Sequence, residues 1–415
     1  MSSRLIITFQ IALISFFMFA DQNLLGPNMT SIAKEFNIVD RKDQLLGGLI
    51  PLSFWLLGGT VSLLIGFLTD IFSRKTLFTL VVFIGEIPCL LSAFSDTYLE
   101  FFILRSLTGI GIGGIIPLTY SIIGDYYSAN ERIKIVTLIG FASGLGIAIG
   151  QLTAGMVGDI YGWRLPFMIF AIPNIVLGIV FYFTVSEPSR GNMDASTKEF
   201  KISNFLDFIS IFKIKTNILV FLQGIFGTIP WGVFSVFIID YFVIDKGYSK
   251  PIATLVITLV GGMALLSSLL GGYLGNFLYK RNPRYLPLFC GFSTILGVIP
   301  TAFLINAPIR LDGSDTLLIL YAIFTGLLIA MTPPNIKVIL MNVNNPFSRG
   351  TVFSFYNLAD DLGRGLGPFI IGNVLIHHFG RSIAFNIANG FWFICGCLIL
   401  IMVKTFPKEN NGRVA

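Results

Sequence analysis

Long apolar runs alternate with short polar stretches along the whole chain. The runs are about 20 to 28 residues long, enough to cross a hydrocarbon core of roughly 30 Å as α-helices. Frequent Gly and Pro, with weak period-two alternation, argue against a β-barrel. We therefore predict an all-α membrane protein with twelve transmembrane helices, at residues 5–28, 44–66, 76–95, 98–124, 135–157, 165–186, 216–240, 251–277, 285–306, 316–341, 351–376 and 383–403.

Composition supports the membrane assignment. The 415 residues are 54% hydrophobic and 12% charged, with a mean hydropathy of +0.81, too few polar side chains to cover a soluble globule. The net charge of +6 is scattered among the turns and does not predict a nucleic-acid site. The four cysteines lie inside apolar runs, and no Ser/His/Asp set, HExxH motif, Walker loop or Cys/His cluster occurs. We expect neither an enzyme nor a metal or cofactor site.

The distribution of Lys and Arg predicts the orientation. The two terminal segments and the even-numbered loops hold 17 of the 28 basic residues, and the opposite loops hold eight. The positive-inside rule then places both termini in the cytoplasm, in a plasma or inner membrane. The longest polar stretch, 187–215, is the predicted cytoplasmic linker between an N-terminal bundle, 1–186, and a C-terminal bundle, 216–415.

The two halves share internal matches. Residues 66–75 and 272–281 both begin with Gly, carry an Asx residue fifth and end with two cations, and we interpret both as short polar turns. Residues 125–132 match 342–349, with the Asx and the Arg in register. Gly146, Gly150 and Gly155 correspond to Gly363, Gly367 and Gly372, a spacing that lets another helix approach closely. A duplicated six-helix unit with pseudo-symmetry explains these matches.

These motifs resemble those of the major facilitator superfamily of secondary transporters. Residues 66–75 resemble its loop between helices two and three, with Ile71 and Ser73 departing from the pattern; 105–111 and 162–167 resemble its helix-four signature and the start of helix six. The resemblance implies that Asp70 caps a neighbouring helix and favours the outward-facing state. We assign conformational gating to the cytoplasmic-loop residues Gly66, Asp70, Arg74, Asp125 and Arg132.

Within the superfamily, the chain resembles the Spinster-like transporters of lysolipids and sphingolipids. Asp21 occupies the position of the aspartate in their first helix, although Gln22 replaces the arginine that follows it. Arg105 to Gly111 resembles their fourth helix, but Ile112 stands where a glutamate is expected. Transporters of organic anions and sugar acids are almost equally similar.

Charged residues within predicted spans need a partner or a water-filled cavity. Asp21 and Arg105 fall about seven residues from the outer ends of helices one and four, so we expect them to be partners at equal depth, about 10 Å below the outer surface. Either they couple transport to a proton or they form a permanent ion pair. Glu86, in helix three, is either a further proton site or a neutral buried acid.

A second set of polar residues falls in helices seven, ten and eleven and is our predicted substrate site. Asp360, Asp361 and Arg364 leave a negative surplus that Lys337 partly offsets, which favours a cationic headgroup, Na⁺ or H⁺. An internal salt bridge within helix eleven is the alternative. Pro333 and Pro334 predict a break in helix ten before Asn335, and Pro230 predicts one in helix seven before Trp231.

These observations together predict a secondary active transporter that works by alternating access. We expect proton coupling, with sodium as the alternative, and an amphipathic, lipid-like substrate such as a lysophospholipid. A proton-coupled carrier of small organic anions or sugar acids, or drug efflux, remains open as the runner-up. A non-transporting receptor or a lipid scramblase built on the same bundle is the third hypothesis. We expect a monomer in the bilayer with no nucleic-acid partner.

Overall fold

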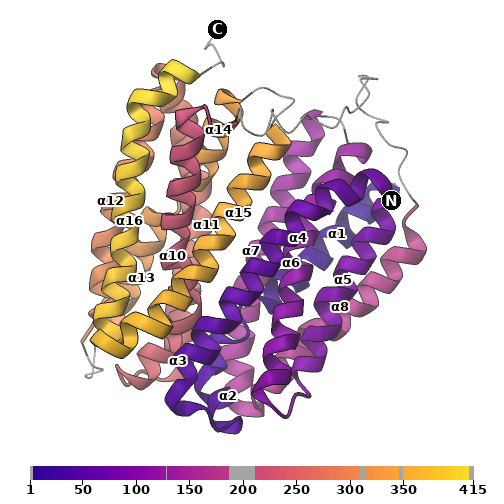
Figure 1. The fold of residues 1–415 in the computed structure, drawn as a ribbon, viewed down its shortest axis with the longest axis vertical. Coiled ribbons are helices and arrows are strands. Elements are labelled where there is room, and N and C mark those ends of the chain that lie inside the picture. The colour runs from indigo at the N-terminus through magenta and orange to yellow at the C-terminus, as the bar shows by residue number, and fades with distance from the viewer. Residues whose placement is uncertain (1–2, 128, 187–210, 309–314, 345–348, 411–415) are drawn as a thin grey trace. The chain divides into compact units, whose positions relative to one another are not determined.

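The computed structural model describes residues 3–127, 129–186, 211–308, 315–344 and 349–410, and all elements in these ranges are helical (Figure 1). The chain forms two compact units, Met1–Phe200 and Lys201–Ala415. The division falls within the predicted linker, of which residues 187–210 lie outside the described part of the chain.

The first unit is built from long helices and a series of short ones. The long helices are α1 (Ser3–Asp21), α4 (Ile50–Ile71), α5 (Arg74–Ser92), α6 (Tyr98–Tyr126), α7 (Ala129–Tyr161) and α8 (Arg164–Thr184). Between α1 and α4 lie η1 (Gly26–Asn28), α2 (Met29–Glu35), η2 (Val39–Arg41), α3 (Lys42–Gln44) and the π-helix η3 (Leu45–Leu49).

The second unit contains α10 (Lys215–Ile244), α11 (Lys250–Arg281), α12 (Tyr285–Ile305), α13 (Asp315–Ile329), α14 (Pro333–Val343), α15 (Arg349–Ile370), the π-helix η4 (Ile371–Leu375) and α16 (Ile376–Glu409). Helix ten is therefore split into α13 and α14 immediately before Pro333, as predicted. Proline lacks an N–H and fits the first turn of a helix, so it starts α14 and cannot continue α13.

Eleven helical stretches in the described residues are long and apolar enough to cross a membrane. The last, Val352–Glu409, has 58 residues, about 87 Å of helix and far too long for one crossing. Its backbone leaves the helical region at Gly380, with φ 76° and ψ 166°, a conformation that glycine adopts at little cost. Division at Gly380 gives the twelve predicted crossings.

Corresponding helices pack in the same pairs within each unit. In the first unit α1 packs on α7 and α8, α4 on α6, and α5 on α6 and α8. In the second unit α10 packs on α15 and α16, α11 on α13, and α12 on α13 and α16. The two lists match position by position, which is the arrangement expected of a duplicated six-helix unit.

Predicted close contacts are present at four of the six glycines, two in each unit. A methyl group added at Gly146 or Gly150 of α7 would collide with the α1 backbone at Phe16 or Ala20. Gly363 and Gly367 of α15 lie in the same way against the backbone of α10. The absent side chains therefore allow the fifth helix of each unit to touch its first.

The prediction of polar turns at 66–75 and 272–281 was wrong. Helix α4 continues to Ile71 and α5 starts at Arg74, so only two residues separate these helices, while 272–281 is the last part of α11. Their Gly, Asx and cationic residues recur about every four positions, which also suits one face of a helix. In both cases the helix continues beyond the end of its apolar run, so the polar residues there do not mark a turn.

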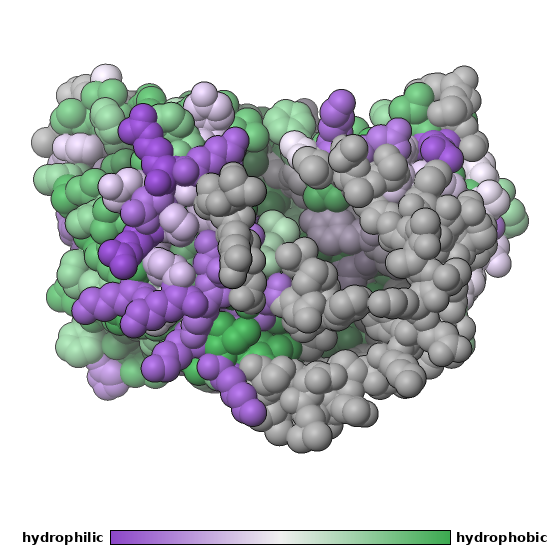
Figure 2. All heavy atoms as spheres, turned by 90° about the horizontal axis from the view of Figure 1, so that it is seen from above, coloured by the Kyte–Doolittle hydropathy of each residue, from purple (hydrophilic) through white to green (hydrophobic). Residues whose placement is uncertain are grey.

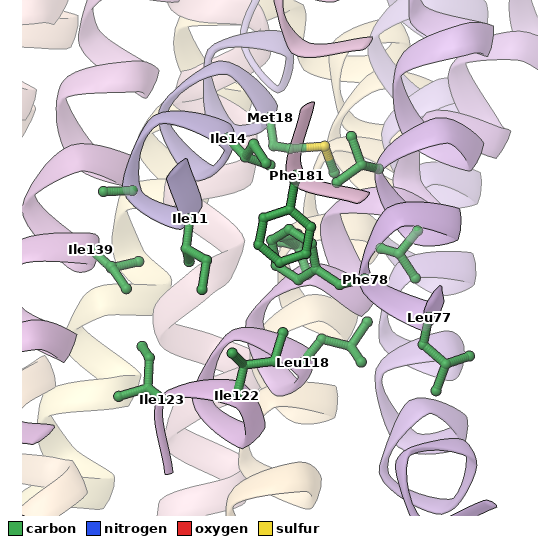
Figure 3. Close-up of a cluster of buried hydrophobic side chains, with 14 of the residues drawn as sticks. Ile11, Ile14, Met18, Leu77, Phe78, Leu118, Ile122, Ile123, Ile139 and Phe181 are labelled. Carbon is green, nitrogen blue, oxygen red and sulfur yellow. The ribbon is translucent and has the colours of Figure 1, made fainter. Parts of the chain in front are cut away.

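The first unit has a core of aliphatic and aromatic side chains from several helices. Figure 3 shows Ile11 and Ile14 of α1, Phe78 of α5, Leu118 of α6 and Phe181 of α8 in this cluster. Many large apolar side chains are instead exposed, as expected for a surface that faces lipid. Figure 2 looks onto the helix ends that are uppermost in Figure 1 and shows hydrophilic residues gathered at this end of the second unit.

Candidate functional site

Helix one is broken next to its only acidic residue. The predicted helix 5–28 ends at Asp21, and residues 22–25 are irregular before η1 begins at Gly26. Asp21 is therefore the last residue of α1, rather than lying seven residues from the helix end, and it is fully buried. A helix that ends inside the protein leaves backbone carbonyls without intrahelical partners.

Arg105 of α6 satisfies one of these carbonyls. Its Nη2 donates to the backbone oxygen of Asp21 at 2.9 Å, and its Nη1 lies 3.6 Å from Cys89 Sγ. The guanidinium also lies over the rings of Phe54 and Phe167, 5.7 and 5.3 Å from their centroids. Two aromatic faces and a helix C-terminus, which carries partial negative charge, stabilise a buried cation.

The structure brings Asp21 and Arg105 together but not as the predicted ion pair. Arg105 contacts the main chain of Asp21, and neither carboxylate oxygen of Asp21 has a hydrogen-bond partner among the described residues. The break in helix one explains the difference, because it offers the guanidinium a carbonyl acceptor. The carboxylate is left free to interact with other groups.

The group beside the Asp21 carboxyl is a second acid. Asp21, Glu86 and Cys89 each place one potential ligand atom within 4.8 Å of the others, and all three are buried. Glu86 Oε1 accepts a hydrogen bond of 2.5 Å from Asn174 Nδ2 of α8, while Glu86 Oε2 has no described partner. Two carboxyl groups so close together in a buried site favour a state in which they are not both charged.

The same three residues are the one group in the described chain that could hold a metal ion. A divalent ion there would lie beside the guanidinium of Arg105, which already contacts both Cys89 and Asp21. The repulsion between these cations argues against such a site. With both acids ionised, the two carboxylates and Arg105 would leave one negative charge, which a single proton neutralises.

The second unit collects the predicted substrate residues around α15. Asp360 and Asp361 both interact electrostatically with Arg364, and Asp360 also with Tyr356 and Lys337. The Asp360 carboxylate lies against Gly224 of α10, and its backbone oxygen accepts a hydrogen bond of 2.8 Å from Thr228. Lys337 of α14 is exposed, and the three charged residues of α15 are half-buried. These four residues remain a candidate binding site.

Asn335 and Trp231 have structural contacts that the sequence did not indicate. Asn335 is buried, and its Nδ2 donates to the carbonyls of Gly271 and Met331, both at 2.9 Å. It therefore ties α14 to α11, next to the break in helix ten. Trp231 packs edge-on against Trp392 at 5.8 Å. The predicted break at Pro230 is absent, since α10 runs unbroken from Lys215 to Ile244.

The predicted gating residues fall at helix ends. Gly66 and Asp70 lie in the last turns of α4, Asp125 near the end of α6, and Arg132 in the first turn of α7. The surroundings of Gly66 and the side chains of the other three lie outside the described residues. Arg74 begins α5, whose N-terminus is capped by Ser73. Gating by these residues stays a prediction.

Sequence reasoning missed Asn174, which lies within an apolar run and has no charge to mark it. It also missed the contacts of two arginines, Arg164 at the start of α8 and Arg381 just after the kink of α16. Arg164 bonds to Glu35 and donates to the Ser95 carbonyl at 2.7 Å, and Arg381 bonds to Asp240 and Asp245 at 2.8 and 2.9 Å. Arg164 lies two residues after Gly162, and Arg381 directly follows Gly380; both glycines have positive φ. A glycine followed closely by an arginine was therefore a usable sequence signal.

Comparison with known proteins extends these observations. The family profile described as Major Facilitator Superfamily matches residues 11–368. The cis,cis-muconate transport protein of Acinetobacter baylyi is 23% identical over 392 residues, covering 93% of this chain and 91% of that protein. Protein spinster of Drosophila melanogaster is 26% identical over 372 residues, covering 86% of this chain but 59% of that protein.

Among solved structures, the chain is similar in fold to a bacterial homologue of the human lysosomal transporter Spinster in an inward-facing, unoccupied conformation. The TM-score is 0.82 at 20% sequence identity, with 99% of this chain and 98% of that chain covered. The family profile matches most of the chain, and the structure has twelve crossings in two six-helix units with the same helix packing. The protein is therefore a multi-pass membrane protein of the Major Facilitator Superfamily of transporters.

Proposed function

We propose that the protein is a proton-coupled secondary transporter that moves an amphipathic, lipid-like solute by alternating access. One observation carries the coupling. The buried carboxyl of Asp21 has no described donor and lies beside Glu86, at a break in helix one, with Arg105 as the neighbouring cation. Broken helices with ionisable residues are typical of coupling sites in transporters.

A proton fits this cluster better than sodium. Sodium needs several oxygen ligands, whereas here Asn174 and Arg105 point N–H donors at the cluster and Cys89 adds a sulfur. A proton needs only one pair of oxygen atoms. Protonation and deprotonation also change the charge of the site by one unit, which lets the site couple its conformation to a proton gradient.

The substrate assignment rests on the second unit and on the relatives. The mixed charges of Asp360, Asp361, Arg364 and Lys337 suit a headgroup with a cationic part. The similarity to protein spinster and to the bacterial Spinster homologue supports a lipid-like solute. We assign this site to the headgroup of the solute and expect its acyl chain to contact apolar side chains of the helices.

A small organic anion is the second candidate. The match to the muconate transport protein covers 93% of this chain and 91% of that protein. Lys337 and Arg364 supply cations that can bind carboxylates. In this case Lys337 and Arg364 would contact the substrate and the acids would not. The two candidates therefore differ in which charged residues matter.

The test is uptake into proteoliposomes with an imposed pH gradient. Lysophosphatidylcholine and cis,cis-muconate are supplied as parallel labelled substrates. We expect gradient-driven uptake of the lysolipid, loss of the gradient dependence in Asp21→Asn, and retention of substrate exchange in that variant. The control is Asp40→Asn, which changes an exposed aspartate of the same unit.

Three outcomes would contradict the proposal. Gradient dependence in Asp21→Asn equal to that of wild type would remove Asp21 from the mechanism. Uptake of muconate without lysolipid would favour the anion carrier. Lysolipid movement that ignores both proton and sodium gradients would favour a scramblase.

A further inference from the structure

A pair of buried carboxyl groups lies inside the first unit. Asp21 at the end of α1 and Glu86 of α5 have no exposed surface, and their carboxyl oxygens come within 4.8 Å of each other. Three of their four oxygens, both of Asp21 and Oε2 of Glu86, have no described donor. In a site closed to water, unused acceptors of this kind call for a proton or a cation.

Close packing holds Glu86 in position. The adjacent Gly85 meets Gly111 of α6 backbone to backbone, with the end of the Met18 side chain against both glycines. The residue after Gly111 is Ile112, a buried member of the apolar core. Next to this glycine contact α5 therefore carries an acid, while α6 carries an apolar side chain.

Asn174 of α8 fixes the orientation of the Glu86 carboxyl. Its Nδ2 donates to Glu86 Oε1 at 2.5 Å and lies 3.3 Å from the carbonyl oxygen of Ile14. An amide nitrogen can only donate, so Oε1 must be the accepting oxygen. The other oxygen, Oε2, is then left to carry a proton toward Asp21.

The charges around the pair allow one proton. The polar and titratable groups that face it are Asp21 on α1, Glu86 and Cys89 on α5, Arg105 on α6 and Asn174 on α8. Arg105 supplies one positive charge, which balances one carboxylate. A second carboxylate would be an uncompensated buried charge, a costly state in a membrane interior.

We propose that Asp21 and Glu86 share a single proton and that Asn174 is the positioning residue that orients Glu86 for this sharing. The inference rests on the proposed proton coupling and deepens it. The proton is held on Glu86 Oε2 and donated to a carboxylate oxygen of Asp21. When it crosses, Glu86 becomes the carboxylate and Asp21 the acid, so the pair keeps one negative charge opposite Arg105. The pair then titrates as a unit.

Infrared difference spectroscopy of the full chain in lipid at neutral pH tests the sharing. A protonated carboxyl gives a C=O band that a carboxylate lacks. We expect this band to be lost in Glu86→Gln and also in Asp21→Asn, because either change leaves one acid balanced by Arg105 with no proton required. Asp40→Asn, at an exposed aspartate, retains the band.

The test of Asn174 is the position of the same band. In Asn174→Ala the carbonyl of Glu86 loses its donor, so the band shifts to higher frequency while the protein stays folded. A purely structural role for Asn174 would leave the band where it is. If Glu86→Gln fails to fold, Asp21→Asn and Asn174→Ala still give both readouts.

Retention of the band in Asp21→Asn would overturn the sharing, since Glu86 would then be neutral by itself. Absence of the band in wild type, or its loss on adding Na⁺, would overturn it as well. The spectrum is independent of transport. If the band behaves as expected but transport does not depend on a pH gradient, the proposed proton coupling is wrong and the shared proton is still supported.

Discussion

The guanidinium of Arg105 donates to the backbone carbonyl of Asp21 at 2.9 Å, while the carboxylate of Asp21 lacks a described donor. Arg105 therefore has two physical roles. It satisfies a carbonyl freed where α1 ends, and it supplies the positive charge for the neighbouring acids. The two roles can be separated, because only the second depends on the charge of Asp21.

Replacing Arg105 with Gln should destabilise the first unit by about 3 to 5 kcal/mol, since the acids lose their compensating charge. Asp21→Asn in the Arg105→Gln background should recover part of this loss, by about 1 to 3 kcal/mol. Thermal unfolding in detergent checks both values. Lys34→Gln, at an exposed lysine, is the control. Additive effects of the two substitutions would show that Arg105 acts only as a cap.

Close contact between α7 and α1 predicts a large difference between two glycines of α7. An Ala methyl at position 150 would collide with the backbone of Ala20, whereas one at position 140 meets nothing within 4 Å. Gly150→Ala should lower stability by about 1 to 3 kcal/mol. Gly140→Ala should raise it by up to about 1 kcal/mol through helix propensity. Equal melting temperatures would contradict the close contact.

The fold followed from local patterns in the sequence. The length of an apolar run, a proline such as Pro333 and a glycine such as Gly150 act within one helix or on its immediate neighbour. For this reason the twelve crossings, the split of helix ten and the tight packing of helix five were predictable. The end of α1 at Asp21 was not, because Arg105 from another helix satisfies the carbonyl there. Asn174 was missed for the same reason, since its role exists only through contact with Glu86.

Neighbouring residues of α14 should behave differently when changed. Asn335→Ala removes donors to the carbonyls of Gly271 and Met331 and should cost about 1 to 3 kcal/mol of stability without changing substrate preference. Lys337→Gln, at an exposed side chain, should leave stability unchanged and weaken the apparent affinity for an anionic substrate. Melting temperatures and KM values measured side by side check this. A change of KM in Asn335→Ala alone would support the prediction that Asn335 belongs to the substrate site.

Arg381 should stabilise the second unit mainly through one of its two acidic partners. Its carboxylate contacts are nearly equal in length, 2.8 Å to Asp240 and 2.9 Å to Asp245, but the Asp240 side chain is 5% exposed and that of Asp245 is 37% exposed. A buried pair loses about 3 to 5 kcal/mol when one partner is removed, whereas an exposed pair contributes at most about 1 kcal/mol. Arg381→Gln should therefore lower the melting temperature far more than Asp245→Asn does, and Asp240→Asn added to Arg381→Gln should restore part of the loss. Similar small effects of Arg381→Gln and Asp245→Asn would mean that burial does not strengthen the contact with Asp240.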